Sequence, residues 1–308
     1  MISPYVRRRR LAAELIGLRE RHGYSAERLA KAADLGRQSV SRLENGHVRP
    51  DLDQIMRILA VFDVQADEWD RVVTIAREAQ ERGWWEKFAN EMGPRQALYA
   101  NLEAGAIHIR EYQMTLLPGL LQIPTYTEAR VRASRDVHPR RFDPSRSLEA
   151  RVARQRVLDR PGGPTYEVVL DELAIRRLAA PPDIVATQLD HLIDTGHYRQ
   201  KITIRILRLD TRIEGYAVPR SAFSIYQYPD DPEVVAVDTV TSDLVLIDPA
   251  EVRLYLTLYH RLRDAALPPS DSLDFLATVA EDVTNQEGDQ RDHSQPRQVH
   301  RLAKVQPQ

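Results

Sequence analysis

Apolar residues in the first eighty positions recur at helical spacing. Leu11, Leu15 and Leu18 follow an i, i+4, i+7 pattern, which predicts an amphipathic helix that ends near Gly23. The same kind of spacing recurs in four later stretches, each with a plausible N-cap, turn or apolar face. The five predicted helices are residues 7–22, the stretch from Ser25 to Ala33, residues 37–46, the stretch from Asp51 to Phe62, and a helix that carries Trp69 and Ala76 and ends at Trp84 and Trp85. Residues 1–83 are therefore expected to form an all-α domain.

The pattern changes after residue 84, where short apolar runs alternate with helical periods. Strands are predicted at residues 166–172, 201–207 and 222–228, with a hairpin at 233–238 and 243–248. Helices are predicted at residues 95–113, from about 124, and at 146–158, 181–196, 252–267 and 270–284. Residues 84–284 are therefore expected to form an α+β domain. The polar tail 285–308 is expected to be disordered, because it has too few apolar residues to fold.

The helix over residues 37–46 has two different faces. At about 100° per residue, its hydrogen-bonding side chains fall within an arc of about 140°. Those side chains are Arg37, Gln38, Ser41, Arg42 and Asn45. Val40 and Leu43 point the opposite way. One face is expected to dock on a core, while the other presents donors to an outside partner.

Charge is distributed unevenly along the chain, whose formal net charge is −2. Residues 1–50 contain eleven Lys and Arg against five Asp and Glu, a local net charge of +6. Residues 51–83 contain four Arg against eight Asp and Glu, a local net charge of −4. A basic patch confined to the segment with the two-faced helix indicates a polyanionic partner for that end.

Composition excludes several classes of protein. The 308 residues are 43% hydrophobic and 29% charged, as in globular domains, and no apolar run approaches 18 residues. The arginine-rich N-terminus lacks the apolar segment of a secretory signal, and the absence of cysteine excludes disulfides and thiolate metal sites. We expect a cytoplasmic protein with no membrane association.

Two short helices joined by a tight turn, the second with a polar outer face, are typical of a helix-turn-helix. The stretch SAERLAKAADLGRQSVSRLENG at residues 25–46, followed by Pro50 and Leu52, resembles the XRE/Cro-repressor family of five-helix DNA-binding domains. The resemblance implies that Arg37, Gln38 and Arg42 contact base edges.

The resemblance also implies roles for other polar residues. Ser39, Ser41 and Asn45 lie where the family contacts bases or phosphates, and Arg49 with Arg7, Arg8, Arg9 and Arg10 would add phosphate contacts. Arg19 and Glu44 match a family ion pair between the first helix and the recognition helix. Three positions depart from the family pattern: Ala26 replaces a frequent Gln, Asp34 replaces the turn glycine, and Gly36 replaces a capping Ser or Thr.

The second segment resembles a domain of unknown activity that follows XRE helices in many actinobacterial regulators, among them the WhiJ-like regulators. The resemblance spans roughly residues 95–283 and depends on the stretches EYQMTLLPGLLQIPTY, VVLDELAIRR, ITIRIL, FSIYQYPD and LVLIDPAEV. Such proteins are described as antitoxin-like and are often encoded beside a small acidic BldB-like protein. The resemblance implies a sensor, partner-binding or dimerisation module, and no reaction.

Catalytic and metal motifs are absent from the sequence. Asp171 and Glu172 are adjacent at a strand end and so point to opposite faces, and His191 and His197 are out of register on a helix. The chain has no nucleophile elbow, glycine-rich phosphate loop or zinc-helix motif. We therefore expect no enzyme activity, no metal and no cofactor.

Two features of the second domain are candidate contacts for a partner or ligand. The apolar run with Leu117, Pro118 and Leu120 is interpreted either as core or as the lining of a groove. The basic helix with Arg151 and Arg154 is interpreted as a solvated face, a site for an acidic partner, or an additional DNA contact.

The leading hypothesis is a sequence-specific transcriptional regulator that binds a pseudo-palindromic operator in double-stranded DNA as a homodimer. Its second domain would receive a signal from a partner protein or a small ligand. The first alternative is an antitoxin-like interaction protein that binds a small acidic partner and autoregulates its operon. The second alternative is an enzyme with a DNA-binding appendage.

Overall fold

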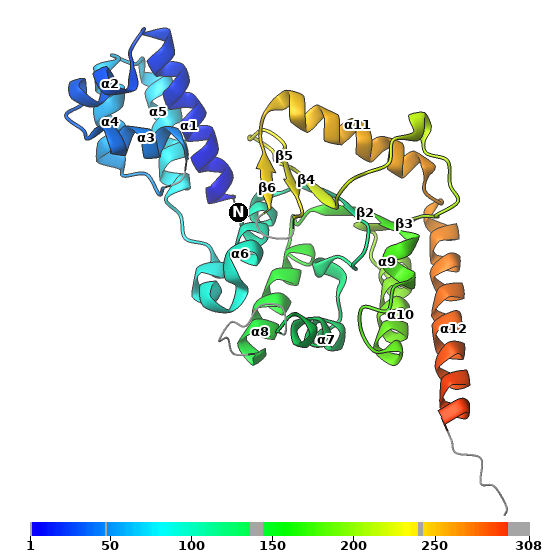
Figure 1. Cartoon of the computed structure of the whole chain (residues 1–308). Coiled ribbons are helices and arrows are strands. Elements are labelled where there is room, and N and C mark those ends of the chain that lie inside the picture. The colour runs from blue at the N-terminus through cyan, green and yellow to red at the C-terminus, as the bar shows by residue number, and fades with distance from the viewer. Residues whose placement is uncertain (1, 47, 136–143, 240–242, 295–308) are drawn as a thin grey trace, which may run out of the picture.

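The computed structural model describes residues 2–46, 48–135, 144–239 and 243–294. The N-terminal helices and a larger domain built on a six-stranded sheet lie side by side (Figure 1). The expected order, an all-α helix-turn-helix domain followed by an α+β domain, is confirmed.

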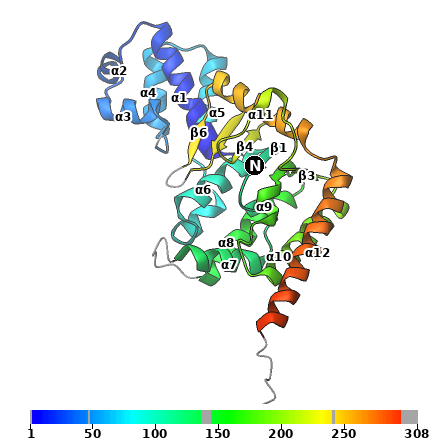
Figure 2. The same cartoon turned by 45° about the vertical axis from the view of Figure 1, so that its right-hand side comes forward.

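The first domain contains five helices around one apolar core. They are α1 (Pro4–Arg21), α2 (Ala26–Ala32), α3 (Arg37–Glu44), α4 (Leu52–Val61) and α5 (Ala66–Ala79). The predicted apolar faces meet there: Leu15, Leu18, Ile55 and Val72 are all fully buried. The α2, α3 and α4 helices lie on the side of this bundle away from the sheet, and α1 lies between them and the sheet (Figures 1 and 2).

Helix α1 begins at Pro4, three residues before the predicted start, and its first turn packs against the second domain. The Ser3 hydroxyl caps the helix by accepting a hydrogen bond from the backbone N–H of Val6. The same hydroxyl donates to Oδ1 of Asn101, and that oxygen also accepts from the backbone N–H of Tyr5. Because Ser3 is buried against α6 (Ala89–Gly105), the first turn of α1 is fixed to the sheet domain.

The second domain contains a mixed sheet in the order β3-β2-β1-β4-β5-β6. Its strands are β1 (His108–Gln113), β2 (Thr165–Asp171), β3 (Ile202–Leu207), β4 (Phe223–Gln227), β5 (Val234–Val237) and β6 (Leu244–Leu246). Strands β1, β2 and β3 are parallel, whereas β4, β5 and β6 continue the sheet with antiparallel pairing. The predicted hairpin is the β5–β6 pair.

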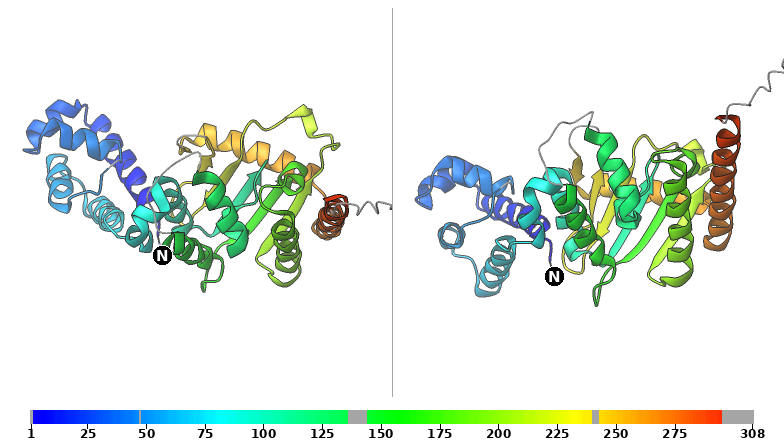
Figure 3. Two further views of the ribbon diagram at one scale, coloured as in Figure 1. Left: turned by 60° about the horizontal axis from the view of Figure 1, so that its bottom comes forward. Right: turned by 90° about the horizontal axis from the view of Figure 1, so that it is seen from below.

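Alternate residues of each strand face two separate cores. On one face, Tyr112, Val169 and Ile225 pack against α11 (Pro249–Ala265). On the other face, Ile109, Val168 and Ile204 pack among the remaining helices. Those elements are α6 (Ala89–Gly105), α7 (Pro124–Arg135), α8 (Pro144–Gln155), α9 (Glu172–Arg176), α10 (Pro182–Tyr198) and α12 (Pro269–Ser294), with short helices η1 (Trp84–Phe88), η2 (Gly119–Leu121) and η3 (Arg156–Leu158). Figure 3 shows α11 on one side of the sheet and the α6–α10 group on the other.

Three expectations about secondary structure were wrong. Residues 95–113 are not one helix, because α6 ends at Gly105 and residues from His108 form the central strand β1. Helix α5 ends at Ala79, before the paired tryptophans, which instead belong to η1. The tail is helical through Ser294, because α12 continues past residue 284; residues 295–308 of the predicted disordered tail lie outside the described residues.

Candidate nucleic-acid interface

Helix α3 presents its polar face to solvent and its apolar face to the core. Val40 and Leu43 are buried among the other helices of the bundle, whereas Arg37, Gln38 and Arg42 are exposed. Arg37 and Arg42 make no hydrogen bond or ion pair with any residue that the structure describes. Their guanidinium donors are therefore available to an outside acceptor.

Ser39, Ser41 and Asn45 lie along the same helix, with different exposure. Ser41 and Asn45 are exposed, and Ser39 is half-buried. The side-chain amide of Asn45 donates to the backbone carbonyl of Ser41 at 2.7 Å, so this residue also ends the helix. Gly46 follows with a φ of +63°, and a Cβ there would lie 3.1 Å from the carbonyl oxygen of Arg8.

The turn between α2 and α3 explains two departures from the family pattern. Asp34 has a φ of +53°, in the left-handed region that the family's glycine adopts without strain and that Asp tolerates better than most residues. Gly36 occupies the N-cap of α3 and supplies no side-chain hydrogen bond to the first turn. The Ser39 N–H donates to the backbone carbonyl of Gly36, whereas the N–H groups of Arg37 and Gln38 remain open to another acceptor, such as a phosphate oxygen.

Arg19 and Glu44 form the ion pair that joins α1 to the end of α3. The Arg19 Nε atom donates to Oε1 of Glu44 at 2.6 Å, and its Nη1 atom donates to the backbone carbonyl of Tyr24. Both side chains are largely shielded from solvent. This contact fixes the recognition helix relative to α1.

The arginine run at the start of α1 is placed differently from the expected phosphate contacts. The Arg7 side chain is only 8% exposed; its Nε lies 2.9 Å from Oε2 of Glu78, and its Nη1 lies 3.1 Å from Oδ1 of Asp231. Arg10 also pairs with Asp231. The start of α1 is buried against the sheet domain, so Arg7 is already neutralised by carboxylates and is not presented to DNA in this arrangement.

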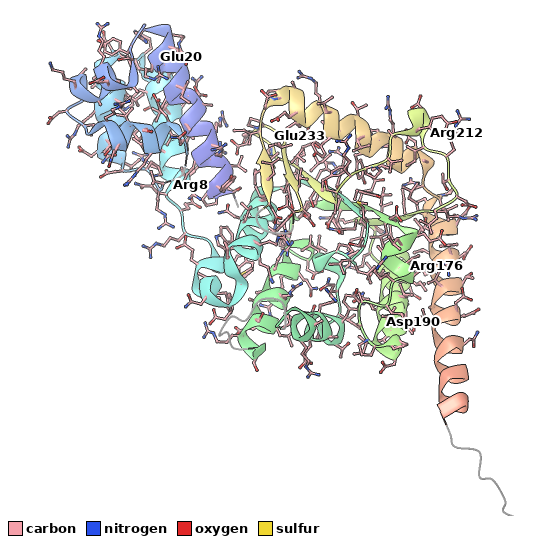
Figure 4. All side chains as sticks on the ribbon, viewed as in Figure 1. Arg8, Glu20, Arg176, Asp190, Arg212 and Glu233 are labelled. Atoms are coloured by element: carbon pink, nitrogen blue, oxygen red, sulfur yellow. The ribbon has the colours of Figure 1, made fainter. Side chains whose placement is uncertain are left out.

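Arg8, Arg9 and Arg49 lie closer to the interface of α3. Arg9 donates to the backbone carbonyl of Asn45 at 2.7 Å, and Arg49 pairs with Glu86 of η1. Burial, followed by the nearby charge of Arg49, lowers the pKa of Arg8 below the usual value. Figure 4 places Arg8 at the end of α1 nearest the sheet domain and Glu20 at the far end.

Comparisons with known families agree with this division of the chain. Residues 15–69 match the family described as Helix-turn-helix, and residues 96–278 match the family described as Domain of unknown function (DUF5753). The chain belongs to the DUF5753 family. Its N-terminal helix-turn-helix makes this DUF5753 protein a DNA-binding regulator. No curated protein and no solved structure matches the chain.

The apolar run of the DUF5753 domain lies in the core rather than along a groove. Leu117, Pro118 and Leu120 are buried, and both leucines belong to the large cluster beneath the sheet. The bond from the side-chain amide of Gln122 to the carbonyl of Leu117 closes this segment on itself. The groove interpretation of these residues does not hold, because the short helix η2 turns the leucines inward.

Arg151 and Arg154 also point inward from α8, so the solvated-face interpretation does not hold for them. The Arg154 Nε atom donates to both carboxylate oxygens of Glu103 on α6, at 2.9 and 3.0 Å. Burial disfavours the charged guanidinium, but the adjacent Glu103 carboxylate raises the pKa of Arg154 above its usual value. Arg151 donates to Oε1 of Gln122, and burial, with the nearby Arg154 charge, lowers its pKa to about 10.

The carboxylates considered for catalysis have structural partners. The Asp171 carboxylate caps α9 through the backbone N–H of Leu173 and accepts a hydrogen bond from the Tyr112 hydroxyl. Glu172 pairs with Arg176 and accepts from the backbone N–H of Leu209. Within the described part of the chain, no group of three or more acidic or histidine side chains is arranged to hold a metal ion. No described helix is long and apolar enough to cross a membrane.

Sequence reasoning missed a buried acid at the centre of the sheet. Glu111 on β1 accepts hydrogen bonds from the Tyr166 hydroxyl at 2.6 Å and from the Gln113 amide at 2.7 Å. Burial raises the pKa of Glu111 to about 7, and those hydrogen bonds oppose the shift. Glu111 was missed because residues 95–113 were predicted to be helical, so no strand was expected at its position.

This buried acid predicts a pH-dependent stability. The unfolded carboxyl titrates near its ordinary pKa of 4.5, whereas the folded one keeps its proton up to about pH 7. The free energy of unfolding should therefore fall as pH rises from 4.5 to 7, by about 3 kcal/mol, and then stay level with respect to this group. Glu111→Gln, which mimics the protonated form, should flatten that slope in urea melts at several pH values. The same slope in both proteins would contradict the assignment.

Proposed function

We propose that this protein is a sequence-specific transcriptional regulator that places α3 in the major groove of its operator. The observation that supports the proposal is the division of α3 into a buried apolar side and an exposed side with unengaged guanidinium and amide donors. Arg can bond guanine O6 and N7 bidentately, and Gln can bond adenine N6 and N7. Arg37, Gln38 and Arg42 are the residues proposed to contact bases.

The proposed phosphate contacts come from the rim of the same face. Ser39, Ser41 and Asn45 lie beside the base-contacting side chains, and Arg8, Arg9 and Arg49 lie around the end of α3. When DNA binds, the Arg49 guanidinium would leave the Glu86 carboxylate and pair with a phosphate. Carboxylate and phosphate are both anions that a guanidinium binds well. Arg7 and Arg10 instead hold the two domains together.

We further propose that the protein binds a pseudo-palindromic site as a homodimer. One helix-turn-helix contacts only a few base pairs, so useful affinity requires two half-sites about one helical turn apart. The DUF5753 domain supplies the dimer contact and receives the signal, from a partner protein or a small ligand. The signal acts by binding the DNA-competent arrangement with a different affinity from the incompetent one.

A selection of genomic fragments with the purified full-length protein tests the proposal. Enrichment of a palindromic site whose affinity falls steeply with salt is the expected result, because phosphate contacts release counterions. Failure to enrich any site at low and at moderate salt would contradict the proposal.

Substitution of Arg42 tests the orientation of α3. Arg42→Ala should relax the preference at one base pair of the selected site, by about 1–3 kcal/mol, because one bidentate contact is lost. Binding to variant sites by fluorescence anisotropy measures the effect. Arg71→Ala, which removes an exposed guanidinium of α5 paired with Glu14, is the matched control and should leave the preference unchanged. An unchanged preference in Arg42→Ala would show that α3 is rotated differently in the groove.

A further inference from the structure

A cavity of about 280 Å³ lies within the second domain and is lined in part by its first residues, Trp84 and Lys87. It is bounded by η1, which follows α5 along the chain, and by α6, α8 and η3. These elements lie side by side below the helix-turn-helix in Figure 1. The volume is close to the lower end of the range found for small-molecule sites, about 300–1,000 Å³.

One part of the cavity wall is flat and apolar. Trp84 contributes a half-buried indole ring, held edge-to-face against the buried Trp85 at a centroid distance of 6.0 Å. Small side chains complete this wall: Ala100, Ala104, Ala153 and Val157. Small residues opposite a fixed indole leave a space that suits a ring or a branched aliphatic group.

The rest of the lining is strongly cationic. Lys87, Arg156 and Arg160 lie around the cavity, and the only acidic lining residue among those described is Glu103. Glu103 is already neutralised by Arg154 through the two hydrogen bonds from its Nε atom. Arg156 is exposed and has no ion pair with any residue that the structure describes. The remaining positive charge favours an anionic ligand group at the rim.

We propose that this cavity binds a small organic anion with a flat or branched apolar body, such as an aromatic carboxylate. The body packs between Trp84 and the small residues of α6 and α8, and the anionic group pairs with Lys87 and Arg156. We take this ligand to be the signal that regulates DNA binding. The regulatory role therefore rests on the proposed function, whereas the binding site itself does not.

The connection to DNA binding runs through η1. This short helix carries both Trp84 in the cavity wall and Glu86, whose carboxylate pairs with Arg49. Arg49 follows the recognition helix in the chain and is one of the proposed phosphate contacts. A ligand that shifts η1 changes how firmly Glu86 holds Arg49, and hence the affinity for the operator.

Fluorescent probes test the site on the full-length protein. The probe 1-anilinonaphthalene-8-sulfonate has an aromatic body and one anionic group, and N-phenyl-1-naphthylamine has the same body without the charge. We expect saturable binding of one sulfonate probe per chain, weakened at least about tenfold by Arg156→Glu. The neutral probe should bind weakly to both proteins. The matched control Arg253→Glu, an exposed arginine of α11 far from the cavity, should leave sulfonate affinity unchanged.

A second pair of variants tests the shape of the site. Ala153→Trp fills the cavity and should abolish saturable binding, whereas Ala186→Trp, in a hollow between α10 and α12, should not. Thermal melts monitored by circular dichroism establish that each variant folds. Binding that is absent, or equal in wild type and Arg156→Glu, overturns the proposal.

Operator binding with and without the sulfonate probe separates the two hypotheses. Enrichment of a DNA site together with no saturable probe site would refute the ligand proposal and leave the proposed function intact. Saturable probe binding together with no enriched DNA would refute the proposed function and leave the ligand site intact. A shift in operator affinity on adding the probe, lost in Arg49→Ala, would support the route through η1.

Discussion

Replacing Arg154 by alanine should lower the free energy of unfolding by about 3–5 kcal/mol, because it leaves a buried carboxylate without its partner. Glu103 is only 2% exposed at its side chain and receives two hydrogen bonds from the Arg154 Nε atom. Among the described residues, no second cationic side chain forms an ion pair with the Glu103 carboxylate. Urea denaturation of the full-length chain measures the loss.

Two further variants separate the charge effect from lost packing. Arg154→Met with Glu103→Leu removes both charges and keeps most of the volume, so it should recover much of the lost stability. Arg253→Ala removes an exposed arginine and should change stability by less than about 0.5 kcal/mol. If the single and double variants were equally unstable, the pair would contribute through packing and not through its charges.

Replacing Arg7 by methionine should cost about 3 kcal/mol of stability, near the lower end of the range for breaking a buried ion pair. Arg7 lies between Glu78 of α5 and Asp231 of the loop before β5, and the Asp231 side chain is only 5% exposed. Arg10 remains beside Asp231, which limits the loss. Because Arg7 joins the DNA-binding helices to the sheet domain, the variant should also unfold less cooperatively.

The same variant tests whether Arg7 contacts DNA. A residue that contacts a phosphate reduces the salt dependence of binding by about one unit of log affinity per log salt when it is removed. We expect no such reduction for Arg7→Met, measured by anisotropy at conditions where the variant is folded. Arg21→Met is the matched control for stability, because it breaks an exposed pair with Glu68 at the other end of α1. It should lower the free energy of unfolding by less than about 1 kcal/mol. A reduced salt slope in Arg7→Met would restore the phosphate role.

The two domains differ in how much local pattern could predict. In the first domain, helix periodicity, caps and the helix-ending glycines Gly23 and Gly46 are short-range signals, so the five helices and the two faces of α3 followed from the sequence. In the second domain, the strands β2 to β6 were recognisable as apolar runs, but β1 was not. Its residues HIREYQ contain four charged or polar side chains, His108, Arg110, Glu111 and Gln113, whose partners lie largely on neighbouring strands.

The roles of the arginines show the same limit. A sequence marks Arg7 and Arg154 as basic, and basic residues near a helix-turn-helix suggest phosphate or solvent. Their acidic partners Asp231 and Glu103 are 224 and 51 positions away. Which arginine is neutralised and which is free depends on where distant carboxylates lie, because ion pairing falls off within a few ångströms.

The sequence alone determined the helix-turn-helix, the identity of the exposed donors on α3 and the α+β character of the second domain. Only the tertiary structure decided that the first turn of α1 packs against the sheet domain, that Glu111 is buried, and that Trp84 faces a cationic cavity. The first set depends on neighbours one helical turn apart along the chain. The second depends on contacts between segments far apart in sequence, which periodicity does not contain.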